Sequence, residues 1–254
     1  MKKYSLFICC MFLLSACGYT TTRHTANYAD ALSTHSIALL PASSEVTMIN
    51  LSGPNERQYE YENTIEPMLQ EALYEALSEK GYNVQMVSKQ KLGMTPVWPK
   101  ILETRDAFKE ARAELYKEPS SSKPENAYNI SGAIKPPYPN GSNVIPPRLW
   151  LIANYTEKVK NSGQLAAEFA TSVALALVGV NHSSGPSEVA ALHIGIIDAR
   201  TGQIVWTDGG GDASNMFDNI SDEPELAQKR VKKVVEGALK GLPAKDKLYE
   251  TEEE

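Results

Sequence analysis

The sequence predicts an α/β fold, a single layered domain with a mixed sheet flanked by helices, preceded by a signal peptide and a flexible tether. Strand-like and helix-like segments alternate over residues 37–242 in the order strand, helix, strand, helix, strand, hairpin, helix. The composition, with 42% hydrophobic and 22% charged residues, is that of a globular protein. Both observations favour one packed α/β domain.

The first predicted unit is a strand, a helix and a second strand. Residues 37–41 form a short apolar run that ends at a proline, which is typical of a buried strand. Residues 59–80 form an amphipathic helix that Gly81 ends. Its apolar face consists of Ile65, Leu69, Ala72, Leu73, Ala76 and Leu77. Residues 82–86 alternate as a strand, and the Ser-, Gly- and Pro-containing segment 42–57 is interpreted as a loop.

The second half contains a helix, a strand, a hairpin and a closing helix. Apolar spacing indicates a helix over 101–116, and the run 149–155 is strand-like. Two β-rich runs, 189–197 and 203–207, are joined by a short glycine-containing turn, which predicts an antiparallel hairpin. An apolar stripe with proline in the first turn predicts the closing helix over 223–240.

The N-terminus has the order of an export signal. Lys2 and Lys3 precede an apolar run over residues 6–14, which is too short to span a bilayer, and two small residues follow. The ending Leu-Ser-Ala-Cys resembles the lipobox of bacterial lipoproteins. That resemblance implies a signal peptide over residues 1–16 and a lipid anchor at Cys17, whose thiol carries acyl chains such as palmitate. The alternative is an ordinary cleaved signal with an accidental cysteine.

The lipobox resemblance also implies a location. The residue after Cys17 is Gly18 rather than Asp. In the lipoprotein sorting rule of enteric-type bacteria, this favours the outer membrane, with the protein on its periplasmic face. We expect residues 17–36, which are polar and without periodicity, to form a lipidated tether. At the other end, residues 243–254 are expected to be a solvated acidic tail.

Charge and cysteine content exclude several classes of function. The formal net charge of −6 argues against nucleic acid as a partner. All three cysteines lie within the first 17 residues, so the body of the protein has no disulfide framework and no cysteine-based zinc site. No familiar catalytic motif occurs. Two aspartates in residues 208–212 could hold a cation, but a flexible strand exit is favoured there. We therefore expect that the protein is not an enzyme and that it binds no metal and no cofactor apart from the covalent lipid.

The hairpin supplies a second resemblance. Its matching residues are Asp198, Thr201, Gly202, Ile204, Val205 and Trp206. They resemble the Asp-x-x-Thr-Gly hairpin of the curli-export lipoprotein (CsgG) family, whose relatives include the TolB amino-terminal domain and LpoB-type activators of peptidoglycan synthases. The resemblance implies a CsgG/TolB-N-like domain over residues 37–242. A proline-rich insertion over residues 119–147, with seven prolines, departs from the family pattern.

Residues 165–180 allow two interpretations. As a strand, one face of the segment would carry Leu165, Phe169, Val173, Leu175 and Leu177. Because the other face would be small or polar, this alternation suits a pore-forming membrane strand, and the position matches that of the membrane hairpin of the curli-export channel. The five alanines and the i, i+4 apolar spacing suit a packed helix equally well. The large apolar residues are thus candidate membrane or subunit contacts.

These observations predict a membrane-anchored periplasmic lipoprotein that is a non-enzymatic adaptor or assembly factor of the cell envelope or of a secretion system. Its expected partners are the membrane, through the N-terminal lipid, and envelope proteins, and it could form a homo-oligomer. The alternatives are a subunit of a curli-export-like secretion pore and an activator of a peptidoglycan synthase. A hydrolase would need a catalytic group that the sequence does not reveal.

Overall fold

The computed structural model describes residues 22–50, 53–90, 97–116, 148–160, 189–212 and 223–250. The strands are β1 (Arg23–His24), β2 (Ile37–Leu39), β3 (Ser43–Ile49), β4 (Glu56–Arg57), β5 (Val84–Met86), β6 (Leu149–Lys160), β7 (Val189–Asp198) and β8 (Ile204–Asp212). The helices are α2 (Tyr28–Thr34), α3 (Tyr59–Glu79), α5 (Val97–Leu115) and α9 (Pro224–Ala238), followed by the 3-10 helix η1 (Lys245–Lys247).

The strands form one mixed sheet of eight strands, which confirms the predicted α/β fold. The main order is β1-β8-β7-β6-β2-β5, and β3 pairs with both β6 and β4. Strands β6, β7 and β8 are antiparallel neighbours, so the predicted hairpin is present as β7 and β8. By contrast, β2 and β3 run parallel to β6, and β2 runs parallel to β5.

Strands β2 and β3 lie end to end along the same side of β6. They pair with residues 149–151 and 154–160 of β6, respectively. Pro41 falls between them, and because proline has no amide hydrogen it cannot continue the ladder. The prediction of a loop over residues 42–57 is therefore wrong. Its first half is strand β3, whose mostly polar sequence reflects a sheet face that is only partly covered.

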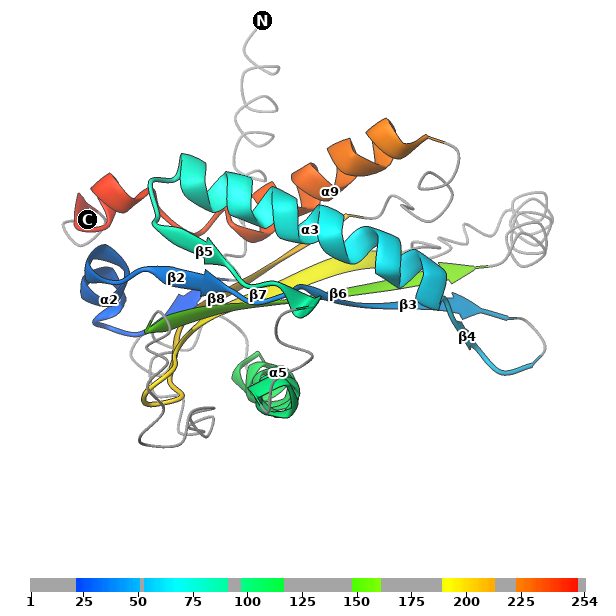
Figure 1. Ribbon diagram of the computed structural model, residues 1–254, viewed down its shortest axis with the longest axis horizontal. Coiled ribbons are helices and arrows are strands. Elements are labelled where there is room, and N and C mark those ends of the chain that lie inside the picture. The colour runs from blue at the N-terminus through cyan, green and yellow to red at the C-terminus, as the bar shows by residue number, and fades with distance from the viewer. Residues whose placement is uncertain are drawn as a thin grey trace, which may run out of the picture.

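Helices α3 and α9 lie side by side on one face of the sheet (Figure 1). Their apolar stripes are buried in the main core. These stripes consist of Ile65, Leu69, Leu73 and Leu77 on α3 and of Val231, Val234, Val235 and Ala238 on α9. Burying one large aliphatic side chain contributes about 1.5–3 kcal/mol, so the i, i+3 and i, i+4 spacing explains why both segments are helical here.

Helix α9 approaches the backbone of β8 at Gly210. A Cβ atom on Gly210 would lie 2.5 Å from the backbone nitrogen of Ala238. Any larger residue would hold the helix away from the sheet. The prediction of a flexible strand exit over residues 208–212 is wrong, because this segment is the end of β8. Glycine is required there for close helix–sheet packing.

Helix α5 lies on the opposite face of the sheet (Figure 1). It packs Ile101 and Phe108 on a second apolar cluster of the sheet, formed by Ala38, Leu40, Trp150, Ile152, Ile197 and Ile204. The helix begins at Val97, four residues before the predicted start. Phe108 sits over Gly195 of β7, where a Cβ atom would lie 2.2 Å from its ring.

Residues 22–36 of the expected tether belong to the folded domain, which corrects the tether prediction over residues 17–36. Strand β1 pairs with β8 through residues 23 and 24. Helix α2 then buries Tyr28, Ala29 and Leu32 in the main core. The i, i+4 pair Tyr28 and Leu32 is the periodic signal that identifies this helix. The rest of the expected tether, residues 17–21, lies outside the described residues.

The first part of the expected acidic tail is folded as well. Leu248 is fully buried, and the backbone amide of Lys245 donates to the carbonyl of Lys80. The Tyr249 hydroxyl contacts Asp30 and Ser33 of α2. Residues 243–250 therefore belong to the domain, and residues 251–254 lie outside the described part of the chain.

Candidate functional site

The residues proposed from the sequence as anchor or membrane contacts lie outside the described residues. They are Cys17, Phe169, Val173, Leu175 and Leu177. The signal peptide over residues 1–16 and the proline-rich insertion over 119–147 also lie outside. All of these remain predictions. Among the described residues, no helix is long and apolar enough to cross a membrane.

The sheet face under α5 changes from apolar to polar along the strands. On β6, Trp150 and Ile152 are buried beneath α5, whereas Asn154 and Thr156 on the same face are partly exposed. Side chains on a strand alternate between faces, so residues two apart share one face. The apolar half of this face holds α5, and the polar half extends beyond that apolar contact.

Four neighbouring strands contribute to the polar half. Ser43, Asn154, His193 and Gly209 are direct cross-strand partners across β3, β6, β7 and β8. The Ser43 hydroxyl donates to Asn154 Oδ1 at 2.7 Å, which places both side chains on this face. We call this surface the polar platform; it consists of Ser43, Glu45, Asn154, Thr156, Lys158, Ala191, His193 and Gly209.

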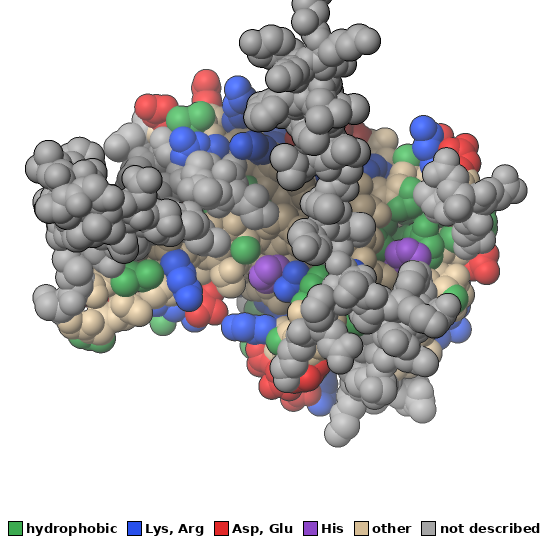
Figure 2. Space-filling model, turned by 180° about the vertical axis from the view of Figure 1, so that it is seen from behind, with side chains coloured by type: hydrophobic (Ala, Val, Ile, Leu, Met, Phe, Trp, Pro, Cys, Tyr) green, Lys and Arg blue, Asp and Glu red, His purple; other side chains and the backbone are tan. Residues whose placement is uncertain are grey.

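Basic side chains from α5 line the platform. Lys109 Nζ lies 3.5 Å from Glu45 Oε2 of β3. Arg112 lies beside Gly209, where a Cβ atom would be 2.8 Å from the guanidinium nitrogen Nη2. In Figure 2, Lys and Arg side chains lie beside a histidine on the side turned away from the viewer in Figure 1. With Lys158, these groups make the platform basic within an acidic protein.

Arg112 is held between an aromatic ring and the sheet. Its guanidinium lies 4.3 Å from the ring centre of Tyr116, and that of Arg23 lies 5.4 Å from the same ring. The Tyr116 hydroxyl donates to the carbonyl of Thr207 at 3.4 Å. Burial lowers the pKa of Arg112 below its ordinary value, and nearby Tyr116 and Asp208 partly oppose this effect. The carbonyl contact anchors Tyr116 to β8 and so fixes the position of Arg112.

His193 is neutral at pH 7 in this environment. Burial, together with the positive charges of Arg112 and Lys109, lowers its pKa from 6.5 to about 4. Its buried Nδ1 has no hydrogen-bond partner among the described residues. In the sequence, His193 lies within the predicted strand 189–197, and no catalytic motif surrounds it. What marks His193 is its pairing with Asn154 of β6. This pairing is visible only once the register between β6 and β7 is known.

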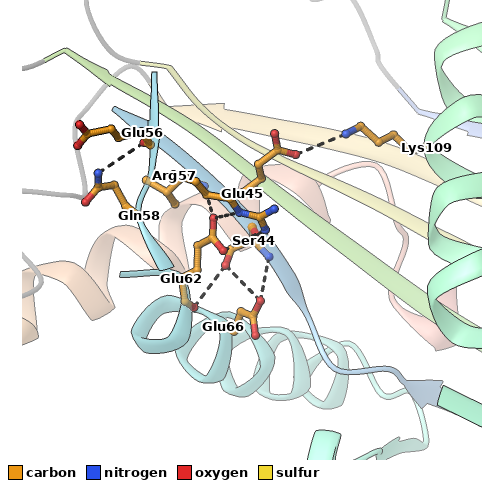
Figure 3. A network of polar contacts seen from close by, with 9 residues as sticks. Ser44, Glu45, Glu56, Arg57, Gln58, Glu62, Glu66 and Lys109 are labelled. Carbon is orange, nitrogen blue, oxygen red and sulfur yellow. Dashed lines mark hydrogen bonds and ion pairs between the residues drawn. The ribbon is translucent and has the colours of Figure 1, made fainter. Parts of the chain in front are cut away.

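A second polar network ties β3 to α3 (Figure 3). The carboxylate of Glu62, which is 5% exposed, accepts hydrogen bonds from the Val46 amide at 2.9 Å and from Arg57 Nε at 2.8 Å. Glu66 accepts a bond from the amide of Ser44. These contacts hold β3 in place on the side of the sheet away from the platform, so we assign them a structural role.

The Asp-x-x-Thr-Gly turn is built as a tight connection between β7 and β8. Asp198 accepts hydrogen bonds from the Arg200 amide and from Arg148 Nε, both at 2.8 Å. Gly202 has a φ of 73°, which favours glycine. Arg148 also lies 3.0 Å from His35 Nε2, which links the turn to the end of α2. The motif residues therefore stabilise the hairpin, and their side chains do not reach the platform.

The arrangement can recognise a ligand through hydrogen bonds and charge. Hydroxyl, amide and imidazole groups stand on adjacent strands, with cationic groups along one side. No group of three or more potential metal ligands occurs within the described ranges. Comparison with known proteins found no protein-family model and no curated protein that matches this chain.

Proposed function

We propose that this protein is a membrane-anchored periplasmic lipoprotein that acts as a non-enzymatic adaptor or assembly factor of the cell envelope. It binds an acidic segment of an envelope protein on the polar platform. The observation that carries the proposal is the platform itself, in which exposed or partly exposed hydrogen-bonding side chains stand on the three neighbouring strands β3, β6 and β7.

Charge supports an acidic segment as the occupant. Lys109 and Arg112 border the platform and Lys158 belongs to it, whereas Glu45 is its single acidic member. Complementary charge accelerates encounter and fixes the orientation of a partner. The polar row then supplies directional hydrogen bonds to the partner's backbone or side chains. Together these features suit a reversible protein contact.

The lipobox resemblance supports anchoring through Cys17. Labelled palmitate should be incorporated into the parent protein and into a Cys9→Ser variant, and it should be lost from Cys17→Ser. Cys9 is the matched control, since it lies in the same leader. Incorporation into Cys17→Ser would contradict the anchor.

The mass of the gently detergent-extracted protein, measured by size exclusion with light scattering, tests the adaptor. We expect the mass of one or two chains plus a partner. Lys158→Glu should reduce it to the mass of the same one or two chains without the partner. Lys229→Glu, the same charge change at an exposed site on α9, should leave it unchanged. A parent mass without a partner contradicts the proposal, and a large discrete multiple of the chain mass would favour the secretion-pore alternative.

A further inference from the structure

We propose that Arg112 and His193 form a binding site for a single oxyanion, either a carboxylate or a phosphate-like group, at the border between α5 and the polar platform. The inference rests on the proposed function, because the oxyanion would belong to the partner segment that docks there. It adds the chemical group that this part of the surface recognises.

The geometry brings two nitrogen atoms to one place. The point where a Cβ atom on Gly209 would lie is 2.8 Å from Arg112 Nη2 and 3.2 Å from His193 Nδ1. The two side chains come from α5 and β7, and both pack closely against the backbone of β8 at Gly209, where a Cβ atom would crowd them. A guanidinium and a protonated imidazole offer charge-assisted hydrogen bonds, which carboxylates and phosphates accept.

The cationic group lacks a local counter-ion. Among the described residues, no carboxylate lies within ion-pair distance of Arg112, and its buried Nε has no hydrogen-bond partner there. The charge of Asp208 raises the pKa of Arg112 through space, without an ion pair between the two side chains. Tyr116 supplies a hydrogen bond and a ring face to the guanidinium but no negative charge, so a bound anion would supply the missing counter-charge.

The histidine gives the site a measurable property. The charged groups that face it are Arg112 and Lys109 of α5, and both oppose its protonation. The negative charge of a bound anion favours protonation of His193 and therefore raises its pKa. If it returned the pKa of His193 from about 4 to its ordinary 6.5, binding would be about 20-fold tighter at pH 5 than at pH 7.

The test is a titration of the detergent-extracted full protein with sulfate and, separately, with formate, both of which stay ionised from pH 5 to pH 7. The Gly209 amide shift in NMR spectra reports binding. We expect saturable binding that strengthens about 20-fold on lowering the pH. Sulfate binding alone would indicate a phosphate-like ligand, and formate binding would indicate a carboxylate. Binding of neither overturns the inference.

Two variants locate the site. Arg112→Met should abolish binding at both pH values, whereas His193→Gln should keep binding at pH 7 and lose the increase at pH 5. Lys229→Met, on α9, should change neither. If Arg112→Met does not fold, the His193→Gln variant still tests the site. Anion binding by this variant that still strengthens at pH 5 would contradict the role of His193. Anion binding that fails while Lys158→Glu still releases the partner refutes this site and leaves the proposed function intact.

Discussion

Replacing Gly210 with alanine tests the contact between α9 and β8. The new Cβ atom would lie 2.5 Å from the backbone nitrogen of Ala238, 2.9 Å from its Cα and 2.9 Å from the carbonyl carbon of Gly237. Ordinary contacts between such atoms need about 3.5–4.0 Å, so the helix would have to retreat by about 1 Å. Every atom in the contact is backbone, and no side chain can rotate away.

The cost follows from what α9 buries. A retreat of the helix loosens Val231, Val234, Val235 and Ala238, which belong to the main core. Overpacking of a well-packed core costs about 1–3 kcal/mol, and a rigid backbone contact belongs at the upper end of that range. For a domain of this size, about 2–3 kcal/mol corresponds to a fall in Tm of about 4–12 °C.

Gly237→Ala is the matched control, since it lies on the same helix. A Cβ atom on Gly237 meets nothing within 4 Å. Alanine there should stabilise the helix by about 0.4–1 kcal/mol, because the unfolded chain loses conformational freedom. Urea denaturation of both variants gives the free energies of unfolding. Opposite signs are expected, and a Gly210→Ala variant as stable as the parent would refute the close approach.

Three further changes test the polar contacts. Glu62→Ala should cost about 1–3 kcal/mol in urea denaturation because the buried Val46 amide loses its acceptor, and Glu62→Gln should cost less. Burial raises the pKa of Asp198, but hydrogen bonds from Arg148 and the turn backbone outweigh it and lower the pKa below 3.8. Stability should therefore fall as the pH drops through the acid range, and Asp198→Asn should weaken this dependence. For His193, whose pKa is lowered to about 4, unfolding takes up a proton, so stability should fall by at most about 3 kcal/mol from pH 6.5 to pH 4, and His193→Gln should remove that fall.

The sequence predicts the elements whose apolar pattern is strong. Helices α3 and α9 show clear amphipathic spacing, and the β7–β8 hairpin is marked by its turn. Strand β3 is missed because it is polar, with only Val46 as a buried large apolar residue on the α3 side. Helix α2 is missed because it is short and alanine-rich, and its core contacts come from residues far away in the sequence.

The candidate site is harder to predict than the fold. The Asp198 turn, which carries the family resemblance, stabilises the hairpin and lies away from the platform. Asn154, His193 and Gly209 come together only through strand register, which sequence spacing does not reveal. Arg112 resembles any surface arginine of an amphipathic helix until the helix is placed on the sheet. The shared role that we propose for these residues depends on the topology, so a single sequence gives little sign of it.

Site-specific photo-crosslinking in intact cells tests the central claim, that the polar platform binds a partner protein. A photoreactive phenylalanine is placed at Thr156 on the platform or at Tyr74, which is 39% exposed on α3. We predict one discrete adduct from position 156, lost with Lys158→Glu and kept with Lys229→Glu, and none from position 74. Equal adducts from both positions, insensitivity to Lys158→Glu, or an adduct with the mass of two chains would contradict the account.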